Sequence, residues 1–240
     1  MRIEVYADVL CPWCYIGKRR LAAALAGLEE RVEVAWRSFE LAPDAPSKPD
    51  GTAAEAMRTW WGDQTESRIA RIRSLGAAEG LELDLDKARP VNTFDAHRLI
   101  HLAADEAQRR DGDGDGDWGW VRAPGSERGS ERSRKRGRNR GDAMVERLLY
   151  AYHTEGLNIG DPEVLISLGA EVGMEPAAVR AVLEGDWYGE QVRGDERRGR
   201  ERGVSGVPTL VIADGAPMSA VQSPEALRGL VMAALEQSPV

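Results

Sequence analysis

The sequence predicts an α/β protein in which the two ends of the chain form one sheet domain and a helical domain interrupts it. Three observations support this prediction. A strand–helix–strand pattern fills residues 2–39, strand character returns only at Thr209–Ala213, and residues 53–202 mostly follow helical spacing. We therefore expect a sheet domain of residues 1–41 and 186–240 and a helical insertion of residues 53–185.

The N-terminal unit begins with an alternating pattern. Ile3, Val5 and Ala7 alternate with more polar neighbours, which is typical of a strand. A helix is expected next, because Pro12 suits a first helical turn and apolar residues then recur on one side. Alternation resumes over residues 32–39 and predicts a second strand, parallel to the first and joined to it by a right-handed crossover.

Helix signals recur through the middle of the chain. Residues 42–52 are rich in proline and are predicted to be a linker. Beyond them, residues that cap helix N-termini precede apolar patterns, and glycines follow several of these patterns. The predicted caps are Asn92–Thr93, Asp142, Asp161 and Asp186, and the predicted stops are Gly80, Gly173, Gly185 and Gly203.

The C-terminal segment returns to strand character. The turn signal Asp214–Gly215 follows the strand expected at Thr209–Ala213, so Pro217–Val221 is predicted to return antiparallel to it. Ser223 then precedes an apolar pattern of helical spacing and opens a final helix. The sheet therefore draws strands from both ends of the chain.

Residues 109–141 break the helical pattern. They hold eight glycines and ten Arg or Lys against six Asp or Glu, so we predict a disordered loop inserted between two helices. Asp111–Gly116 imitates the start of a calcium-binding loop, but Arg122 stands where that loop needs glutamate, so no calcium site is predicted. The basic stretch Arg128–Arg140 is expected to be solvated rather than bound to nucleic acid.

Composition excludes several classes of function. Of the 240 residues, 42% are hydrophobic and 30% charged, which is ordinary for a globular protein. No apolar run is long enough to span a membrane. The net charge of −8 disfavours binding to nucleic acid or to a membrane surface. The first residues lack the pattern of a secretory signal, so a cytoplasmic protein is expected. The protein is expected to be a monomer or a homodimer.

The two cysteines, Cys11 and Cys14, form a single CxxC motif. This count excludes a disulfide-rich scaffold and a four-cysteine metal or iron–sulfur site within one chain. It leaves a redox pair, half of a shared metal site or an inert pair. The position of the motif, after a strand and at the start of a helix, favours the redox pair, with no cofactor or metal besides it.

The spacing of the two cysteines assigns them different roles. Residues three apart lie on one side of the first helical turn, close enough to form a disulfide. Cys11 is expected at the helix N-terminus, where unpaired backbone N–H groups and the helix macrodipole favour a thiolate. Cys14 is expected one turn further in. We therefore predict an exposed attacking thiol at Cys11 and a buried resolving thiol at Cys14.

Four segments of the chain together carry a family resemblance. They are Asp8–Gly17 (DVLCPWCYIG), Phe39–Pro43 (FELAP), Asn92–Leu99 (NTFDAHRL) and Gly203–Thr209 (GVSGVPT). These segments resemble the FrnE-like branch of the DsbA family of thiol–disulfide oxidoreductases. The resemblance implies a thioredoxin-like fold interrupted by an all-helical domain, and substrates that are thiol- or disulfide-containing proteins or small molecules.

The resemblance also implies which residues support the cysteine pair. Pro12 and Trp13 form the interior of the CxxC motif, and Val207–Pro208 would be a cis-proline turn that lies against it. Because Pro208 has no N–H group, the backbone of Val207 is the part of this turn that could pair with an extended peptide.

These observations predict a thiol–disulfide oxidoreductase or disulfide isomerase in which Cys11 attacks and Cys14 resolves. One alternative is an isomerase or transferase acting on small thiol conjugates. The similar 2-hydroxychromene-2-carboxylate isomerases and kappa-class glutathione transferases carry serine where Cys11 stands, so two cysteines favour disulfide exchange. Another alternative is a chaperone-like binder whose helical domain supplies an apolar groove.

Two further residue pairs have spacings or side chains typical of functional sites. His97 and His101 have the i, i+4 spacing of metal ligands, but Arg98 stands where a zinc protease needs glutamate and no third ligand is evident. We therefore predict a pair on a helix face without a metal. Trp60 and Trp61 are expected in the core or in a groove wall of the helical domain, with contact to an apolar substrate as the alternative.

Overall fold

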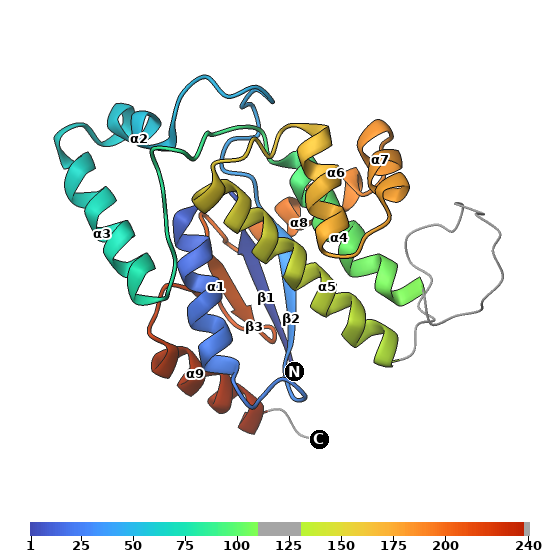
Figure 1. Cartoon of the computed structure of the whole chain (residues 1–240). Coiled ribbons are helices and arrows are strands. Elements are labelled where there is room, and N and C mark those ends of the chain that lie inside the picture. The colour runs from blue at the N-terminus through green and yellow to red at the C-terminus, as the bar shows by residue number, and fades with distance from the viewer. Residues whose placement is uncertain (110–130, 238–240) are drawn as a thin grey trace.

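The computed structural model describes the backbone of residues 1–109 and 131–237. Within these residues the sheet has four strands in the order β2-β1-β3-β4 (Figure 1). β1 pairs parallel with β2, and β3 pairs antiparallel with β4, as the sequence predicts. β1 also pairs antiparallel with β3, which joins the two ends of the chain in one sheet. The strands are β1 (Arg2–Ala7), β2 (Glu33–Ser38), β3 (Thr209–Ile212) and β4 (Met218–Ser219).

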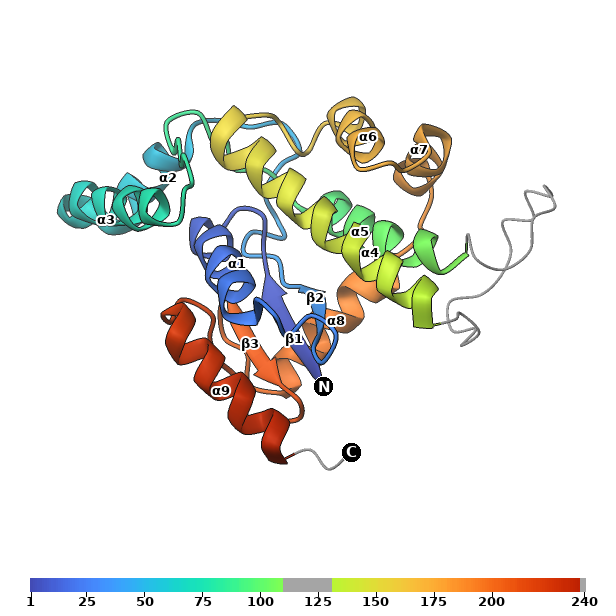
Figure 2. The same ribbon diagram turned by 60° about the horizontal axis from the view of Figure 1, so that its bottom comes forward.

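Helices cover both faces of this sheet (Figures 1 and 2). Ile3 and Val5 of β1 pack in one apolar cluster with residues of α1 (Pro12–Leu25) and α9 (Pro224–Gln237). Successive side chains of a strand point to opposite faces, so Tyr6 lies on the other face, against α8 (Gly189–Glu201). Because β1 is covered on both sides, almost all of its residues are buried.

The remaining helices form two groups around α1 and the sheet (Figures 1 and 2). α2 and α3 stand beside α1, whereas α4 and α5 pack along each other and α6 and α7 gather near one end of that pair. One continuous apolar core runs from the cysteine pair through these helices. Their bounds are α2 (Ala53–Trp61), α3 (Thr65–Ala78), α4 (Phe94–Arg109), α5 (Glu131–Tyr150), α6 (Pro162–Glu171) and α7 (Pro176–Glu184).

Local signals explain several helix ends. The Asp161 carboxylate accepts the N–H of Glu163 at 2.9 Å, and the Ser223 hydroxyl accepts that of Ala226 at 3.2 Å, so these predicted caps are confirmed. The cap predicted at Asp186 is wrong, because α8 begins only at Gly189. No helix in the described ranges is long and apolar enough to cross a membrane.

The disordered loop predicted over residues 109–141 is wrong in its second half. α5 already begins at Glu131, so Asp142 does not cap it. Instead, the Asp142 carboxylate accepts hydrogen bonds from Lys18 at 2.8 Å and from the Trp36 indole at 3.0 Å. Residues 110–130, which include the calcium-loop-like pattern and the start of the basic stretch, lie outside the described residues.

Packing explains why α5 extends through a charged segment. A Cβ at Gly141 would lie 3.3 Å from that of Ala104, so the missing side chain lets α5 approach α4 closely. Once a helix is anchored in this way, each further residue adds a backbone hydrogen bond without a new nucleation cost. The Arg and Lys residues of 131–140 are also good helix formers.

A pair of glycines in α8 tests the packing of this helix on the sheet. A Cβ at Gly199 would lie 2.9 Å from the buried Tyr6 ring, so Gly199→Ala should lower the free energy of unfolding by about 1–3 kcal/mol. At Gly194 the nearest atom would be the end of the Arg197 side chain, 3.9 Å away. Gly194→Ala should therefore stabilise the protein by up to about 1 kcal/mol. Urea denaturation measures the free energy of unfolding of both variants. If both substitutions stabilised the protein equally, this packing of α8 on the sheet would be contradicted.

Candidate active site

The CxxC motif lies where β1 turns into α1. Cys11 directly precedes the first helical residue, Pro12, and has an extended backbone with φ −87° and ψ 112°. The N–H of Cys11 donates to the carbonyl of Asp8 at 3.2 Å, and the carbonyl of Cys11 accepts the N–H of Cys14 at 2.9 Å. Cys11 is therefore at the N-terminus of α1, where the sequence placed it.

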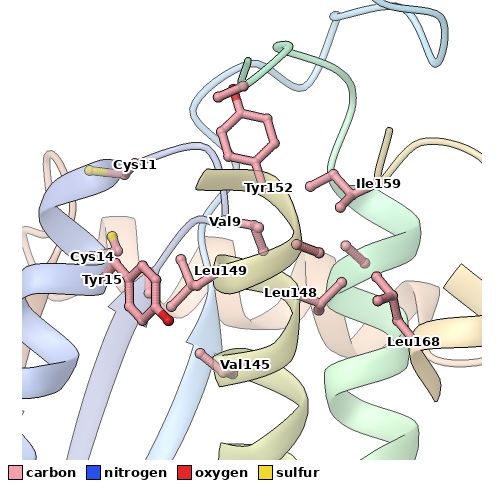
Figure 3. Packing of buried hydrophobic residues seen from close by; sticks show 14 of the residues in the cluster. Val9, Cys11, Cys14, Tyr15, Val145, Leu148, Leu149, Tyr152, Ile159 and Leu168 are labelled. Atoms are coloured by element: carbon pink, nitrogen blue, oxygen red, sulfur yellow. The ribbon is translucent and has the colours of Figure 1, made fainter. Parts of the chain in front are cut away.

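Both cysteines carry free thiols in this structure, and the two side chains point differently (Figure 3). The Cys11 side chain points away from the labelled residues of the apolar cluster, whereas Cys14 lies above Tyr15. Cys11 is 5% exposed and Cys14 is 1% exposed. The expectation of an exposed Cys11 is wrong, because the thiol faces the Val207 carbonyl at 3.7 Å and the turn at Val207 encloses it.

The environment of Cys14 opposes its ionisation. Burial raises the pKa of the Cys14 thiol well above its ordinary value, and the hydrogen bond with Cys11 and the charge of Cys11 raise it further. The Asp8 carboxylate acts in the same direction, while the Asp8 backbone N–H opposes it. Cys14 is therefore a protonated thiol at neutral pH.

The remaining predicted site residues gather around Cys11. The Val207–Pro208 peptide bond is cis. A Cβ at Gly17 of α1 would lie 3.2 Å from the Pro208 ring, so the two segments touch directly. Trp13, Val207 and Pro208 line a cavity of about 360 Å³ beside the cysteine pair. The residues of the CxxC motif and of the Val207–Pro208 turn, almost 200 positions apart in the chain, thus form one site.

A buried polar group beneath the motif was not foreseen from the sequence. The Asp8 carboxylate is fully enclosed and accepts the N–H of Leu41 at 2.6 Å and that of Leu10 at 3.4 Å. His97 Nε2 lies 3.4 Å from the same carboxylate. Burial raises the pKa of nearby Glu40, and the charges of His97 and Arg193 oppose this effect. The three segments that hold Asp8, Glu40 and His97 all belong to the family resemblance.

The two candidate metal ligands on α4 have separate partners. His97 faces Asp8, whereas His101 Nε2 lies 3.2 Å from the Ser38 hydroxyl and 3.3 Å from the Asp195 carboxylate. The Ser–His–Asp contact does not form a catalytic triad, because one ring nitrogen serves both partners. His101 instead joins α4 to β2 and α8.

His153 is a second buried histidine that sequence reasoning did not single out. It lies in a π-helical turn (Ala151–Glu155) that follows α5, and it is completely buried. The ring faces the carbonyls of Val9 and Cys11 without a hydrogen bond of good geometry, and the Tyr152 ring packs on it edge-on at 4.8 Å. Burial lowers the pKa of His153 to about 4.

The two tryptophans at the end of α2 differ in their surroundings. Trp60 is 68% exposed, so it does not belong to the core. Trp61 is partly buried and lines a second cavity of about 520 Å³, together with Trp13 and Ile72. Trp61 is therefore a groove-wall residue, one of the two positions expected for it.

The lowered pKa of His153 predicts how stability depends on pH. Between its ordinary pKa of about 6.5 and its folded pKa of about 4, the unfolded chain binds a proton that the folded protein does not. Stability should therefore fall as the pH decreases through this window, by up to about 3 kcal/mol from this residue. His153→Phe should remove that part of the loss. Denaturant unfolding at pH 7 and pH 4.5 measures it, and an unchanged difference between the two pH values would contradict the assignment.

Known proteins resemble this chain in sequence and in fold. The chain is 26% identical over 216 residues to the uncharacterized protein YwbO of Bacillus subtilis (strain 168), an alignment that covers 89% of this chain and 88% of the relative. The crystal structure of the probable DsbA oxidoreductase SCO1869 from Streptomyces coelicolor superposes with a TM-score of 0.80 at 27% identity, covering 100% of this chain and 92% of that one.

A structure of lower sequence identity and a family model also match this chain. The cytosolic disulfide reductase DsbM from Pseudomonas aeruginosa shares the fold with a TM-score of 0.61 at 20% identity, covering 99% of this chain and all of that one. The family model of the DSBA-like thioredoxin domain matches residues 2–111 and 133–231. The match spans most of the chain and includes the CxxC motif and the Val207–Pro208 turn, so the protein belongs to the DSBA-like thioredoxin domain family.

Proposed function

We propose that the protein is a thiol–disulfide oxidoreductase of the FrnE-like branch, with Cys11 as the attacking and Cys14 as the resolving thiol. One observation carries the proposal: the Cys11 thiol lies at the N-terminus of α1 and against the Val207 carbonyl, beside a cavity and in front of a more buried Cys14. Family membership and the similarity to a probable DsbA oxidoreductase support it. The four resembling segments support the branch.

The reaction follows from the two thiols. The Cys11 thiolate attacks one sulfur of a substrate disulfide, the substrate S–S bond breaks, and the other sulfur leaves as a thiolate that takes a proton. Cys14 then loses its proton and attacks the Cys11 sulfur of this mixed disulfide. The second substrate thiol leaves, and the protein keeps a Cys11–Cys14 disulfide. Two electrons have passed to the substrate, and the reverse sequence oxidises a dithiol.

The surrounding residues position the substrate in this proposal. Pro12 fixes the start of α1 and thereby the position of Cys11. The Val207 backbone next to Cys11 pairs with an extended substrate segment, while Trp13 forms a wall of the cavity. The cysteine pair carries both electrons, so the proposal includes no further cofactor or metal. We place the activity in the cytoplasm, in line with the structural neighbour that is described as cytosolic.

Single cysteine variants test the two roles. Cys11→Ser should abolish turnover of a small disulfide, because the remaining thiol is buried and protonated. Cys14→Ser should still attack but should accumulate a mixed disulfide with the substrate, which intact-mass measurement detects. In the reduced wild-type protein an alkylating reagent should label Cys11 first, and the urea-unfolded protein, in which both sites are open, serves as the control. Faster labelling of Cys14, or trapping only by Cys11→Ser, would reverse the assignment.

A further inference from the structure

A groove between α1 and α3 continues from the cavity beside the cysteine pair. The cavity along the Val207–Pro208 turn and the second cavity, of about 520 Å³, are both lined by Trp13 and Val221. The second cavity reaches α3, which stands beside α1 and away from α6 and α7 in both views (Figures 1 and 2). We call it the α1–α3 groove, and its lining is Trp13, Trp61, Arg68, Arg71, Ile72 and Val221.

The lining of the α1–α3 groove combines apolar walls with positive charge. Two indole rings and two aliphatic side chains form its walls, and its charged residues are the two arginines Arg68 and Arg71. The Arg68 guanidinium lies 5.0 Å from the centre of the Trp61 ring and donates to the Gln64 side-chain oxygen at 2.8 Å. Both arginine side chains are exposed at the groove. None of the described residues that line the groove carries a carboxylate, so the groove is cationic.

Among the residues that the structure describes, other arginines on α2 and α3 form ion pairs with carboxylates, unlike the arginines of the groove. On α2 and α3, Arg58 pairs with Glu66 at 3.2 Å and Arg73 pairs with Asp86 at 2.6 Å. Within the described part of the chain, Arg71 has no such carboxylate partner. The whole protein carries a net charge of −8, so an uncompensated positive groove next to the cysteine pair runs against the overall charge. Such a local field selects anionic ligands.

We propose that the α1–α3 groove binds a carboxylate carried by the peptide part of the substrate while the substrate disulfide reaches Cys11. The guanidinium groups of Arg68 and Arg71 match a carboxylate in charge and in planar geometry, and the indole walls contact the attached carbon chain. The substrate class is an acidic peptide disulfide. The same chemistry is offered by a free acidic tripeptide disulfide such as oxidised glutathione and by an acidic segment beside a protein disulfide. This inference rests on the proposed function.

Matched peptides and arginine variants test the α1–α3 groove. We compare three peptide disulfides of one length that carry Glu, Gln or Lys beside the cystine. For the wild type, kcat/KM should decrease in the order Glu, Gln, Lys. Arg71→Gln should lower the Glu-to-Gln ratio of kcat/KM about fivefold, mainly through KM, as expected for one exposed charge pair. Arg73→Gln is the control on the same helix, since Arg73 pairs with Asp86 outside the groove, and it should keep the wild-type ratio.

Further measurements distinguish a small-molecule substrate from a protein substrate. They also distinguish failure of the groove inference from failure of the proposed function. Preference for oxidised glutathione over the longer Glu peptide indicates a small-molecule substrate, and the reverse indicates a protein segment; either supports the groove. Turnover of the neutral bis(2-hydroxyethyl) disulfide without any charge preference, or an equal effect of Arg73→Gln, overturns the inference and leaves the proposed function intact. If no disulfide is turned over, the proposed function fails. In that case the binding of an S-methylated Glu peptide, followed by tryptophan fluorescence, tests the groove alone. Equal affinity for the S-methylated Glu and Lys peptides would overturn the groove inference.

Discussion

The buried carboxylate of Asp8 holds the cysteine turn in place. A charged group without solvent must be compensated by hydrogen bonds or opposite charge, and leaving it unpaired would cost several kcal/mol. The Asp8 carboxylate accepts the backbone N–H groups of Leu41, which follows β2, and of Leu10, and it lies 3.4 Å from Nε2 of the His97 ring in α4. The end of β1, the segment after β2 and the first turns of α4 therefore meet at this buried carboxylate. Cys11, three residues after Asp8, owes its position to all three segments.

Local patterns predicted the parts of the fold that depend on neighbours in sequence. The alternation of Ile3 and Val5 and the cap at Asp161 are signals of this kind, and both elements form where they indicate. The contact between Asp8 and His97 joins distant segments and leaves no periodic or spacing signal in either one. The family resemblance included both residues without showing that they meet. His153 was missed for a similar reason, since its burial depends on the π-helical turn after α5.

Two expectations failed because tertiary contacts outweighed local composition. Residues 131–141 are rich in charge and contain two glycines, yet they continue a helix that packing against α4 anchors. Cys11 was expected to be exposed as a helix N-terminal residue, but the Val207 turn arrives from the far end of the chain and covers it. Composition describes what a segment prefers alone. It does not include the free energy gained when another segment packs on it.

The different surroundings of the two thiols give the proposed cycle its order. Cys14 is held protonated by burial, by its hydrogen bond with Cys11 and by the charge of Cys11, in that order of importance for its pKa. Once Cys11 has joined the substrate in a mixed disulfide, its sulfur is neutral and no longer contributes that charge. The pKa of Cys14 should then fall, although burial still raises it, and this change favours resolution after the first attack. A substrate carboxylate held between Arg68 and Arg71 would keep the mixed disulfide in position during that interval, because this binding does not depend on the redox state of either sulfur.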